Sequence, residues 1–368
     1  MILPRKLRFK IAEFARSSLG ILPRNYREIY YCHYVNNRFA TAKICHLKQL
    51  LLILSLATLA LTACHRTPDI EVPITRCADM PAPRASATAF AYAGKGYVFG
   101  GRDSAGTLSN HLWQYDPAED KWQDLGEAPL KPRVNALAQP VGEYVYIGMG
   151  FNGHVYNDPS YLRDVWRYAP ATGEWLRIAD FPTTNTVRPV SYAMGDQLYV
   201  LYSSGPGFSR DIHRYDPVSD TWTCLPDDYH RAKAGNGVFG ATCQNRCFIG
   251  GGFNTANLDQ WWEADLTRDH WTKQRAIPDG ARFLSGCTAN SRYIYVLGGR
   301  YWGGALTSGH LYADILRFSP ETNEWETCGT MPYGGAENLI AFTIGEHIYF
   351  GLGEDIDGHI HTQLYRIE

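Results

Sequence analysis

Six points of the chain carry a charged side chain at the same place in a repeated pattern, near a proline or a glycine. Five of these stretches read PAPR, KPR, NTVRP, HRAK and DGAR, and the sixth reads GGAEN. The charged residues are Arg84, Arg133, Arg188, Arg231 with Lys233, Arg282 and Glu337. A guanidinium group binds a carboxylate through two parallel hydrogen bonds, and a carboxyl group such as that of Glu337 can transfer a proton. These residue types predict a site for an anionic or hydroxyl-rich ligand.

Further arginines and two aromatic residues extend this set. Arg102 and Arg300 follow pairs of glycines, and Tyr301 and Trp302 come directly after Arg300 in the loop GRYWGGALTSGH. Aromatic rings stack on the faces of sugars, so these residues are candidates for ligand binding. Arg210 joins Glu337 as a candidate for a catalytic role. An alternative remains open, because arginines at this point of a repeat can also bond strand-end carbonyls or pair with loop acids.

The sequence predicts no metal and no cofactor. His359 and His361 are spaced to share one strand face, but two histidines without a third ligand do not make a zinc site. Asp355 and Asp357 precede Gly358 in a way that resembles the start of a calcium loop, but the rest of the loop pattern is absent.

An eight-residue pattern shows which elements position these side chains. The stretch YDPAEDKW at 115–122 returns as YAPATGEW, YDPVSDTW and FSPETNEW. The copies follow β-rich runs that end in glycines, except that LYVLYSSG before YDPVSDTW has Tyr202-Ser203 in place of the Gly pair. Trp residues at 122, 175, 222, 271 and 325 are therefore 53, 47, 49 and 54 residues apart. The fourth unit has Ala264 in place of the Tyr but keeps its Trp. A period near 50 with paired Gly and spaced Tyr and Trp resembles the kelch repeat.

This resemblance covers about 295 residues and implies an all-β, six-bladed β-propeller. The sixth unit ends at Glu368 without its Trp, whereas ITRCADMP at 74–81 matches WETCGTMP at 325–332. The N-terminal strand is therefore expected to close the last blade, since an open ring would expose sheet edges. The starts of the inner strands share one face with the loops between strands two and three, so the charged residues should surround the channel mouth.

The N-terminal region predicts export and lipid attachment. KQLLLILSLATLALTAC at 48–64 has a basic start, an apolar run too short to span a bilayer comfortably, and a small-residue end. Its last four residues resemble the lipobox of bacterial lipoproteins, which implies lipidation of Cys64. We expect an upstream segment and signal peptide at 1–63, a lipidated tether at 64–72 and the propeller at 73–368. The resemblance implies a membrane partner and a place in the bacterial cell envelope, on the outer membrane or the periplasmic face.

Composition and cysteines add two expectations. The chain has 35 basic and 37 acidic residues and no basic run, which disfavours nucleic acid as a partner. Cys243 and Cys247 flank a plausible hairpin turn and could form a disulfide, but we favour their interpretation as small buried hydrophobes.

Among exported bacterial kelch proteins, the chain resembles the N-acetylneuraminate epimerase family, the sialic acid mutarotases. This resemblance implies anomer exchange by a glutamate near an arginine that holds the sugar acid. The family motif falls on YSSGPGFSR at 202–210, where Pro206, Gly207 and Arg210 fit loosely and the glutamate is missing; Glu337, Glu354 or Asp355 could substitute. Galactose oxidase also contains kelch repeats, but its seven blades and its Cys–Tyr copper site are not matched here.

Three functions are therefore open. The first is a lipid-tethered propeller that binds an anionic carbohydrate or an acidic peptide. The second is a mutarotase-like enzyme whose acid/base has moved. The third is a protein–protein interaction scaffold that uses the same face.

Overall fold

The computed structural model describes residues 70–153, 160–183, 188–201, 210–225, 230–233, 235–304 and 309–368. The predicted leader and the lipidation candidate Cys64 lie outside the described residues. In the described part of the chain, no helix is long and apolar enough to cross a membrane.

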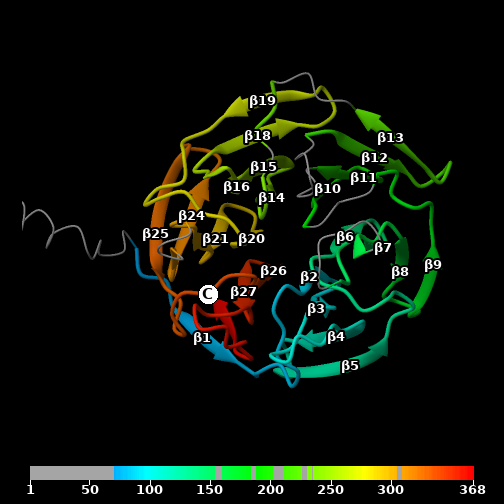
Figure 1. Ribbon diagram of the computed structural model, residues 1–368, viewed down its shortest axis with the longest axis horizontal. Helices are drawn as coiled ribbons and strands as arrows, with labels where there is room; N and C mark the ends of the chain where they lie inside the picture. The colour runs from blue at the N-terminus through cyan, green and yellow to red at the C-terminus, as the bar shows by residue number, and fades with distance from the viewer. Residues whose placement is uncertain are drawn as a thin grey trace, which may run out of the picture. The chain divides into compact units, whose positions relative to one another are not determined.

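Six four-stranded antiparallel sheets, the blades, are arranged around a central axis (Figure 1). The prediction of an all-β, six-bladed propeller is confirmed. Blade one is formed by β2 (Thr88–Tyr92), β3 (Lys95–Phe99), β4 (His111–Asp116) and β5 (Lys121–Glu127). Blade two is formed by β6 (Leu137–Val141), β7 (Tyr144–Gly148), β8 (Val165–Ala169) and β9 (Glu174–Arg177). Blade three is formed by β10 (Val190–Met194), β11 (Gln197–Leu201), β12 (Ile212–Asp216) and β13 (Thr221–Leu225).

The other three blades follow the same order. Blade four is formed by β14 (Phe239–Cys243), β15 (Arg246–Gly250), β18 (Trp261–Asp265) and β19 (His270–Lys273). Blade five is formed by β20 (Gly286–Ala289), β21 (Ile294–Leu297), β24 (Asp314–Ser319) and β25 (Glu324–Thr330). Blade six is formed by β26 (Ile340–Ile344), β27 (His347–Gly351), β28 (Leu364–Ile367) and β1 (Ile74–Cys77). Two small hairpins extend blades four and five, namely β16 (Phe253–Asn254) with β17 (Ala256–Asn257) and β22 (Arg300–Tyr301) with β23 (His310–Leu311).

The N-terminal strand closes the ring as the repeat predicts. β1 pairs antiparallel with β28, so that Ile74 faces Ile367 and Cys77 faces Leu364. The backbone N–H of Glu368 also donates to the carbonyl of Pro73 at 3.2 Å. The two ends of the propeller are therefore joined within one sheet, and β28 has no open edge.

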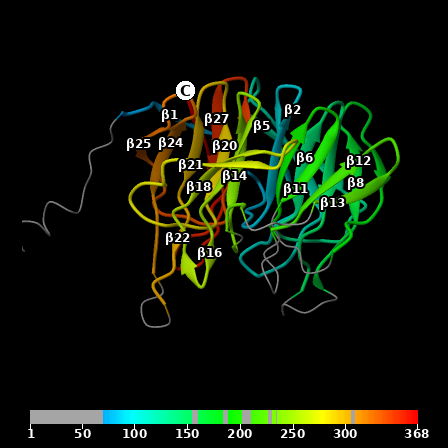
Figure 2. The same cartoon turned by 90° about the horizontal axis from the view of Figure 1, so that it is seen from above.

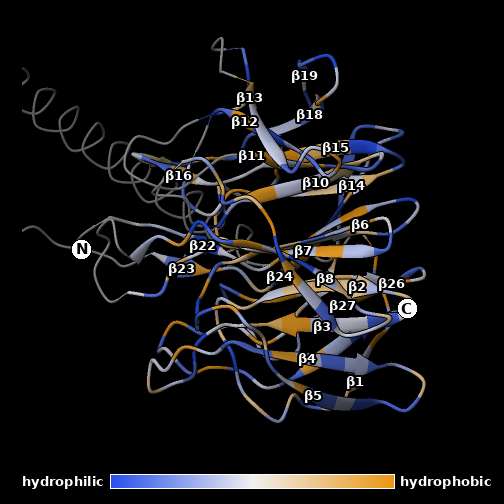
Figure 3. Ribbon diagram, turned by 90° about the vertical axis from the view of Figure 1, so that its right-hand side faces the viewer, coloured by the Kyte–Doolittle hydropathy of each residue, from blue (hydrophilic) through white to orange (hydrophobic). Residues whose placement is uncertain are grey.

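Burial is greatest in the second strand of each blade, and the inner strand, which lines the channel, is only partly buried. The second strand is enclosed on both faces, which explains its near-continuous apolar run; Tyr97, Val98 and Phe99 of β3 are at most 3% exposed. Hydrophobic residues gather in the strands, and hydrophilic residues gather in the loops and turns (Figure 3). The described residues form six large apolar clusters, and each of them fills the gap between two neighbouring blades.

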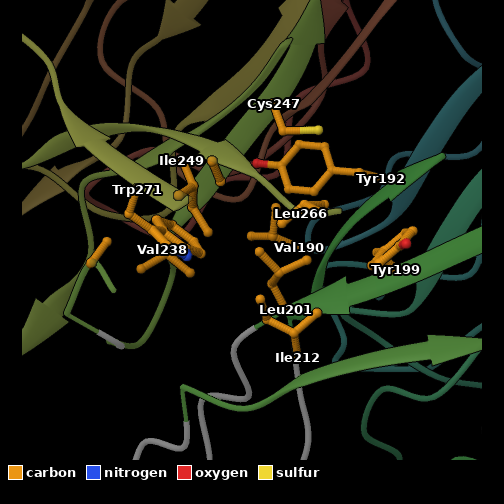
Figure 4. Packing of buried hydrophobic residues seen from close by; sticks show 12 residues of the cluster. Val190, Tyr192, Tyr199, Leu201, Ile212, Val238, Cys247, Ile249, Leu266 and Trp271 are labelled. Atoms are coloured by element: carbon orange, nitrogen blue, oxygen red, sulfur yellow. The ribbon is translucent and has the colours of Figure 1, made fainter. Parts of the chain in front are cut away.

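The cluster between blades three and four illustrates this packing (Figure 4). Val190 and Leu201 of blade three meet Ile249 and Trp271 of blade four. The hydroxyl of Tyr192 in blade three donates to the backbone carbonyl of Phe248 in blade four. Burying rings of this size contributes roughly 4–6 kcal/mol each at about 25 cal/mol/Å² of apolar surface.

The repeated Tyr and Trp hold neighbouring blades together. Tyr215 faces Trp222 across the β12–β13 pair, with ring centroids 5.1 Å apart. The indole N–H of Trp222 donates to the carbonyl of Ala179 at 3.0 Å, and the N–H of Ala179 donates to Asp220 at 2.9 Å. Ala179 follows the last strand of blade two, so this pair of bonds clamps blade three to its neighbour. The same two bonds recur at Trp122 with Asp120 and at Trp325 with Asn323.

Candidate functional site

One end of the central channel is ringed by six residues that precede the inner strands. They are Ser86, Asn135, Arg188, Gly237, Leu284 and Asn338, and all have φ between 52° and 65°. Backbone hydrogen bonds link neighbouring members, for example from Asn135 N–H to Ser86 at 2.9 Å and from Leu284 N–H to Gly237 at 3.0 Å. We call this end of the channel the mouth. Figure 2 shows that the β16 and β22 hairpins lie on its side of the propeller, opposite the C-terminus.

The left-handed backbone explains part of the residue choice at the mouth. Asn tolerates this conformation, and a Cβ at Gly237 would lie 2.8 Å from the backbone nitrogen of Leu284. Arg188 adopts the same conformation with φ of 52°. A long side chain in this region costs about 1–2 kcal/mol, and such outliers cluster at functional sites.

Two cavities occupy the axis. A cavity of about 160 Å³ lies at the mouth and is lined by Arg188, Asn135 and Asn338 among others. A cavity of about 460 Å³ continues along the channel between the inner strands, where small residues such as Ala89 and Gly240 leave room. A ligand group can therefore enter the mouth without displacing the packed blades.

The structure places Arg133 and Arg282 inside their blades. Arg133 is fully buried, and its guanidinium donates twice to Asp164, with both distances 2.9 Å. Arg282 is also fully buried and donates twice to Asp314, at 2.6 and 2.9 Å. These contacts favour a structural role for both arginines over ligand binding, because two N–H groups of each guanidinium already donate to an aspartate.

Arg231 pairs within its blade, and Arg84 bonds a neighbouring carbonyl. Arg231 is 3% exposed and forks onto Asp269, the residue that precedes Trp271 by two positions. This ion pair therefore stands where blades one, three and five have an Asp or Asn that bonds, with the Trp, a residue of the preceding blade. Arg84 donates to the carbonyl of Pro83 at 3.0 Å, and burial lowers its pKa, which Asp103 and Asp124 oppose. Lys233 is exposed, and its backbone N–H donates to Gln260.

Arg188 differs from these arginines because it reaches across the mouth. Its Nη1 donates to Asn236 Oδ1 at 3.1 Å, and its Nη2 donates to Asn338 Oδ1 at 3.2 Å. Asn338 precedes blade six, which lies opposite blade three in the six-membered ring. These two acceptors are amide oxygens, and they hold the guanidinium at the mouth.

The other predicted residues that converge here form two ion pairs beside Arg188. Arg300 binds Glu337 through its Nε, 2.9 Å from Oε2, and through its Nη2, 2.7 Å from Oε1. Arg102 binds Glu354, which also accepts from the amide of Asn338 at 2.8 Å. The backbones of Glu337 and Glu354 bond each other reciprocally, both at 3.0 Å. The structure therefore brings Arg102, Arg188, Arg300 and Glu337 together.

The carboxyl group of Glu337 has an altered acidity. Its side chain is 9% exposed. Burial raises the pKa of Glu337 above its usual range, Glu354 adds to this effect, and Arg300 and Arg188 oppose it. A carboxyl group with a raised pKa keeps its proton to higher pH, which suits general acid–base chemistry near neutrality.

The remaining predicted residues lie around this cluster. Tyr301 and Trp302 are 37% and 40% exposed and follow Arg300 on the mouth side of blade five. Arg210 exchanges backbone contacts with Arg231, since Nη1 of each donates to the carbonyl of the other at 3.1 and 2.9 Å. Pro206 and Gly207 lie outside the described residues.

Asp355, Asp357 and His359 bring possible ligand atoms within 4.8 Å of one another. Asp355 already accepts from the backbone N–H groups of Asp357 and His359 at 2.9 Å, and its other oxygen lies 3.0 Å from the His359 ring. This is the bonding of a turn. The ring of His361 instead packs 4.6 Å from that of Tyr333.

The two neighbouring cysteines face different sides of their sheet. Cys243 pairs with Arg246 in the hairpin register, and Cys247 pairs with Thr242. Cys243 packs between blades four and five, whereas Cys247 packs between blades three and four. Both are free and buried, as the interpretation of small buried hydrophobes expects.

The sequence argument missed the asparagines that hold Arg188. Asn236 lies three residues before β14, and Asn338 lies two residues before β26. Both are close in sequence to the charged residues that were predicted as ligand contacts. Their signal was the return of Asn at this point of the repeat, in GNG and AEN. An amide that orients an arginine has no motif of its own, so the pattern alone did not distinguish it.

Two protein-family models match the chain. The KLHDC2/KLHL20/DRC7 Kelch-repeats domain matches residues 55–205, and the Kelch motif matches residues 281–332. The prediction of kelch repeats is therefore confirmed.

Several relatives share part or most of the chain. N-acetylneuraminate epimerase 1 of Escherichia coli O6:H1 is 26% identical over 319 residues, which cover 79% of this chain and 78% of that protein. N-acetylneuraminate epimerase of Salmonella typhimurium is 28% identical over 140 residues, or 34% of this chain and 35% of its own length. The matched part thus spans about a third of the Salmonella relative. Beta-scruin of Limulus polyphemus is 33% identical over 28% of this chain and 11% of its own.

A solved structure described as the structure of YjhT has the same fold. Its TM-score is 0.65 with 16% sequence identity, and the match covers 78% of this chain and 96% of that one.

Proposed function

Because the chain is a six-bladed kelch propeller homologous to N-acetylneuraminate epimerases, we propose that it binds an anionic sugar of the sialic-acid type at the mouth. The single observation that carries this proposal is the placement of Arg188. Arg188 lines the mouth cavity, and its guanidinium donates to amide oxygens of two residues that precede other blades. Arg133, Arg231 and Arg282 are instead buried within the blades. The carboxylate of the sugar would bind Arg188.

A second function, anomer exchange, is favoured by Glu337. This carboxyl group is buried beside Arg188, and its pKa is raised. Opening a sugar ring requires a proton to be removed from the anomeric hydroxyl and returned to the ring oxygen, and Glu337 could move both protons in turn. Glu337 would then replace the glutamate that the stretch at 202–210 lacks.

We also propose that the propeller is tethered by a lipid on Cys64 in the cell envelope. The first described residues run along the outer strand of blade five, where Ile70 and Val72 donate to Thr327 and Cys328 at 3.1 and 3.2 Å. β1 then begins on the side opposite the mouth. Ile70 lies six residue steps after Cys64, which span at most about 22 Å, so the mouth would face away from the membrane.

The binding proposal is tested by titrating N-acetylneuraminate into the purified chain and following the ligand by NMR. Arg188→Ala should weaken binding by about 10- to 100-fold, since a charge-assisted bond contributes about 1.5–3 kcal/mol. Arg268→Ala is the matched control, because Arg268 is 83% exposed on a turn away from the mouth. Equal affinity in both variants would exclude Arg188 as the anchor.

The same samples test the second function. Equilibration of a freshly dissolved pure anomer should be faster with the wild-type chain than in buffer alone. Glu337→Gln should lose this acceleration and retain binding. A chain that binds the sugar without changing its equilibration rate is a binding protein, and the enzyme proposal would then be abandoned.

A further inference from the structure

Two aromatic side chains stand exposed beside the charged mouth. Tyr301 and Trp302 are the exposed large aromatic residues of the described chain, at 37% and 40%. Both immediately follow Arg300, which binds Glu337. Because two residues of extended chain span at most about 7 Å, the backbone of Trp302 is within that distance of the backbone of Arg300.

The ring of Tyr301 is supported by a stack that reaches the core of blade five. It lies on the His310 ring with centroids 5.2 Å apart and planes 16° apart. His310 meets the edge of Tyr312 at 4.8 Å, and the Arg282 guanidinium lies 3.9 Å above the ring of Tyr312. Arg282 is fixed by Asp314. The arginine that the sequence placed among the ligand contacts therefore supports the aromatic surface from beneath.

The backbone of Trp302 is held by the hairpin of a neighbouring blade. Its backbone N–H donates to Asn257 Oδ1, and its carbonyl accepts from Asn257 Nδ2, both at 2.8 Å. Asn257 belongs to β17, so these two bonds join the hairpins of blades four and five. Exposed aromatic rings cost hydration free energy. The Tyr301 ring is fixed by its stack on His310, and the Trp302 ring projects from a fixed backbone, so both offer contact area on binding.

We infer that Tyr301 and Trp302 form a second sugar subsite, so that the ligand is an anionic oligosaccharide of at least two residues and not only the monosaccharide. The inference rests on the proposed binding of an anionic sugar at the mouth. One sugar unit binds Arg188 through its carboxylate, and the next unit lies against the two rings. Ligands of this kind combine polar edges with apolar faces, which matches a charged pocket that borders aromatic surface.

The test compares N-acetylneuraminate with its α2,8-linked dimer in titrations against the full chain. The wild type should bind the dimer about fivefold more tightly than the monomer, since an aromatic contact contributes about 0.5–1.5 kcal/mol. Trp302→Ala should remove this difference, so that the dimer and the monomer bind with similar affinity. Trp302→Tyr should retain most of it, which separates ring stacking from a general effect of substitution.

Leu176→Ala is the matched control, because Leu176 is 52% exposed on the outer strand of blade two. If Trp302→Ala still binds the dimer more tightly than the monomer, the second subsite is excluded. The subsite is also excluded if Trp302→Ala loses affinity for both ligands equally while its thermal unfolding is unchanged. If Arg188→Ala still weakens binding by about 10- to 100-fold in that case, the proposed function stands and only the subsite fails. If the wild type binds neither ligand, both are overturned.

Discussion

At the scale of single residues, the role of each arginine depends on its partner. Arg133 and Arg282 look alike in the sequence to Arg188, but the first two meet aspartates that come 31 and 32 residues later. Asp164 and Asp314 each stand at the start of the third strand of a blade. The two Arg–Asp pairs could therefore have been recognised from the repeat, because an arginine with an aspartate at that fixed distance is explained within its own blade.

The Arg133–Asp164 pair makes the stability of the propeller depend on pH. Burial alone would raise the pKa of Asp164, but the Arg133 fork and Trp166 bring it below its usual value. Stability from this pair is therefore present above the unfolded-state pKa near 3.9 and is lost as the pH falls through the native pKa. Asp164→Asn should cost about 3–5 kcal/mol at pH 7, and this cost should shrink as the pH is lowered below the unfolded-state pKa, as measured by urea unfolding.

The control for this prediction is Asp180→Asn. Asp180 pairs with Arg177 at 2.9 Å on the surface, with side chains 37% and 57% exposed. Its loss should change the free energy of unfolding by less than about 1 kcal/mol at either pH. A similar loss of unfolding free energy in both variants at pH 7 would show that the buried Arg133–Asp164 pair contributes no more to stability than the surface pair.

At the scale of strands and turns, the repeated motif joins blades as well as building them. The Asp and Trp of YDPVSDTW bind one residue of the preceding blade, and the equivalent residues of two other blades do the same. The repeat in the sequence marks these positions, of which Trp222 is half-buried and Asp220 is exposed. It did not show that the motif reaches a neighbouring backbone, because that contact joins residues about 43 positions apart with no pattern at the receiving end.

Removing one indole hydrogen bond tests this clamp. Trp222→Phe keeps a ring but removes the donor to Ala179, and should cost about 1 kcal/mol beyond the loss of packing. Trp113→Phe is the matched control, because the Nε1 of Trp113 is buried without a hydrogen-bond partner among the described residues. Guanidinium unfolding should show a clearly larger loss for Trp222→Phe, and equal losses would exclude the clamp as a source of stability.

At the scale of the whole propeller, the fold was predictable and the site was so only in part. Four copies of an aromatic and a Trp, with a fifth Trp at the same spacing, define the blades, and the match of ITRCADMP to WETCGTMP identifies the closing strand. Convergence at the mouth requires side-chain directions that a repeat does not specify. Four of the predicted charged residues meet there, whereas Arg133, Arg231 and Arg282 turn into their blades.

The positions of the chain ends lead to a prediction about the proposed lipid anchor. Acyl labelling of the expressed protein should be lost in Cys64→Ser, and the protein should move from the membrane fraction to the soluble fraction. Its affinity for the sugar should not change, because β1 begins on the side opposite the mouth. Continued membrane attachment of Cys64→Ser would contradict the anchor, and altered affinity would contradict the orientation.

The ring of left-handed residues has a consequence for engineering. Main-chain bonds between neighbouring members set the width of the opening, and their side chains supply only its chemistry. The side chains around the opening can therefore be replaced without changing its main-chain frame. Exchanging Ser86 or Asn135 for other small polar residues should alter which solutes are admitted without changing the diameter.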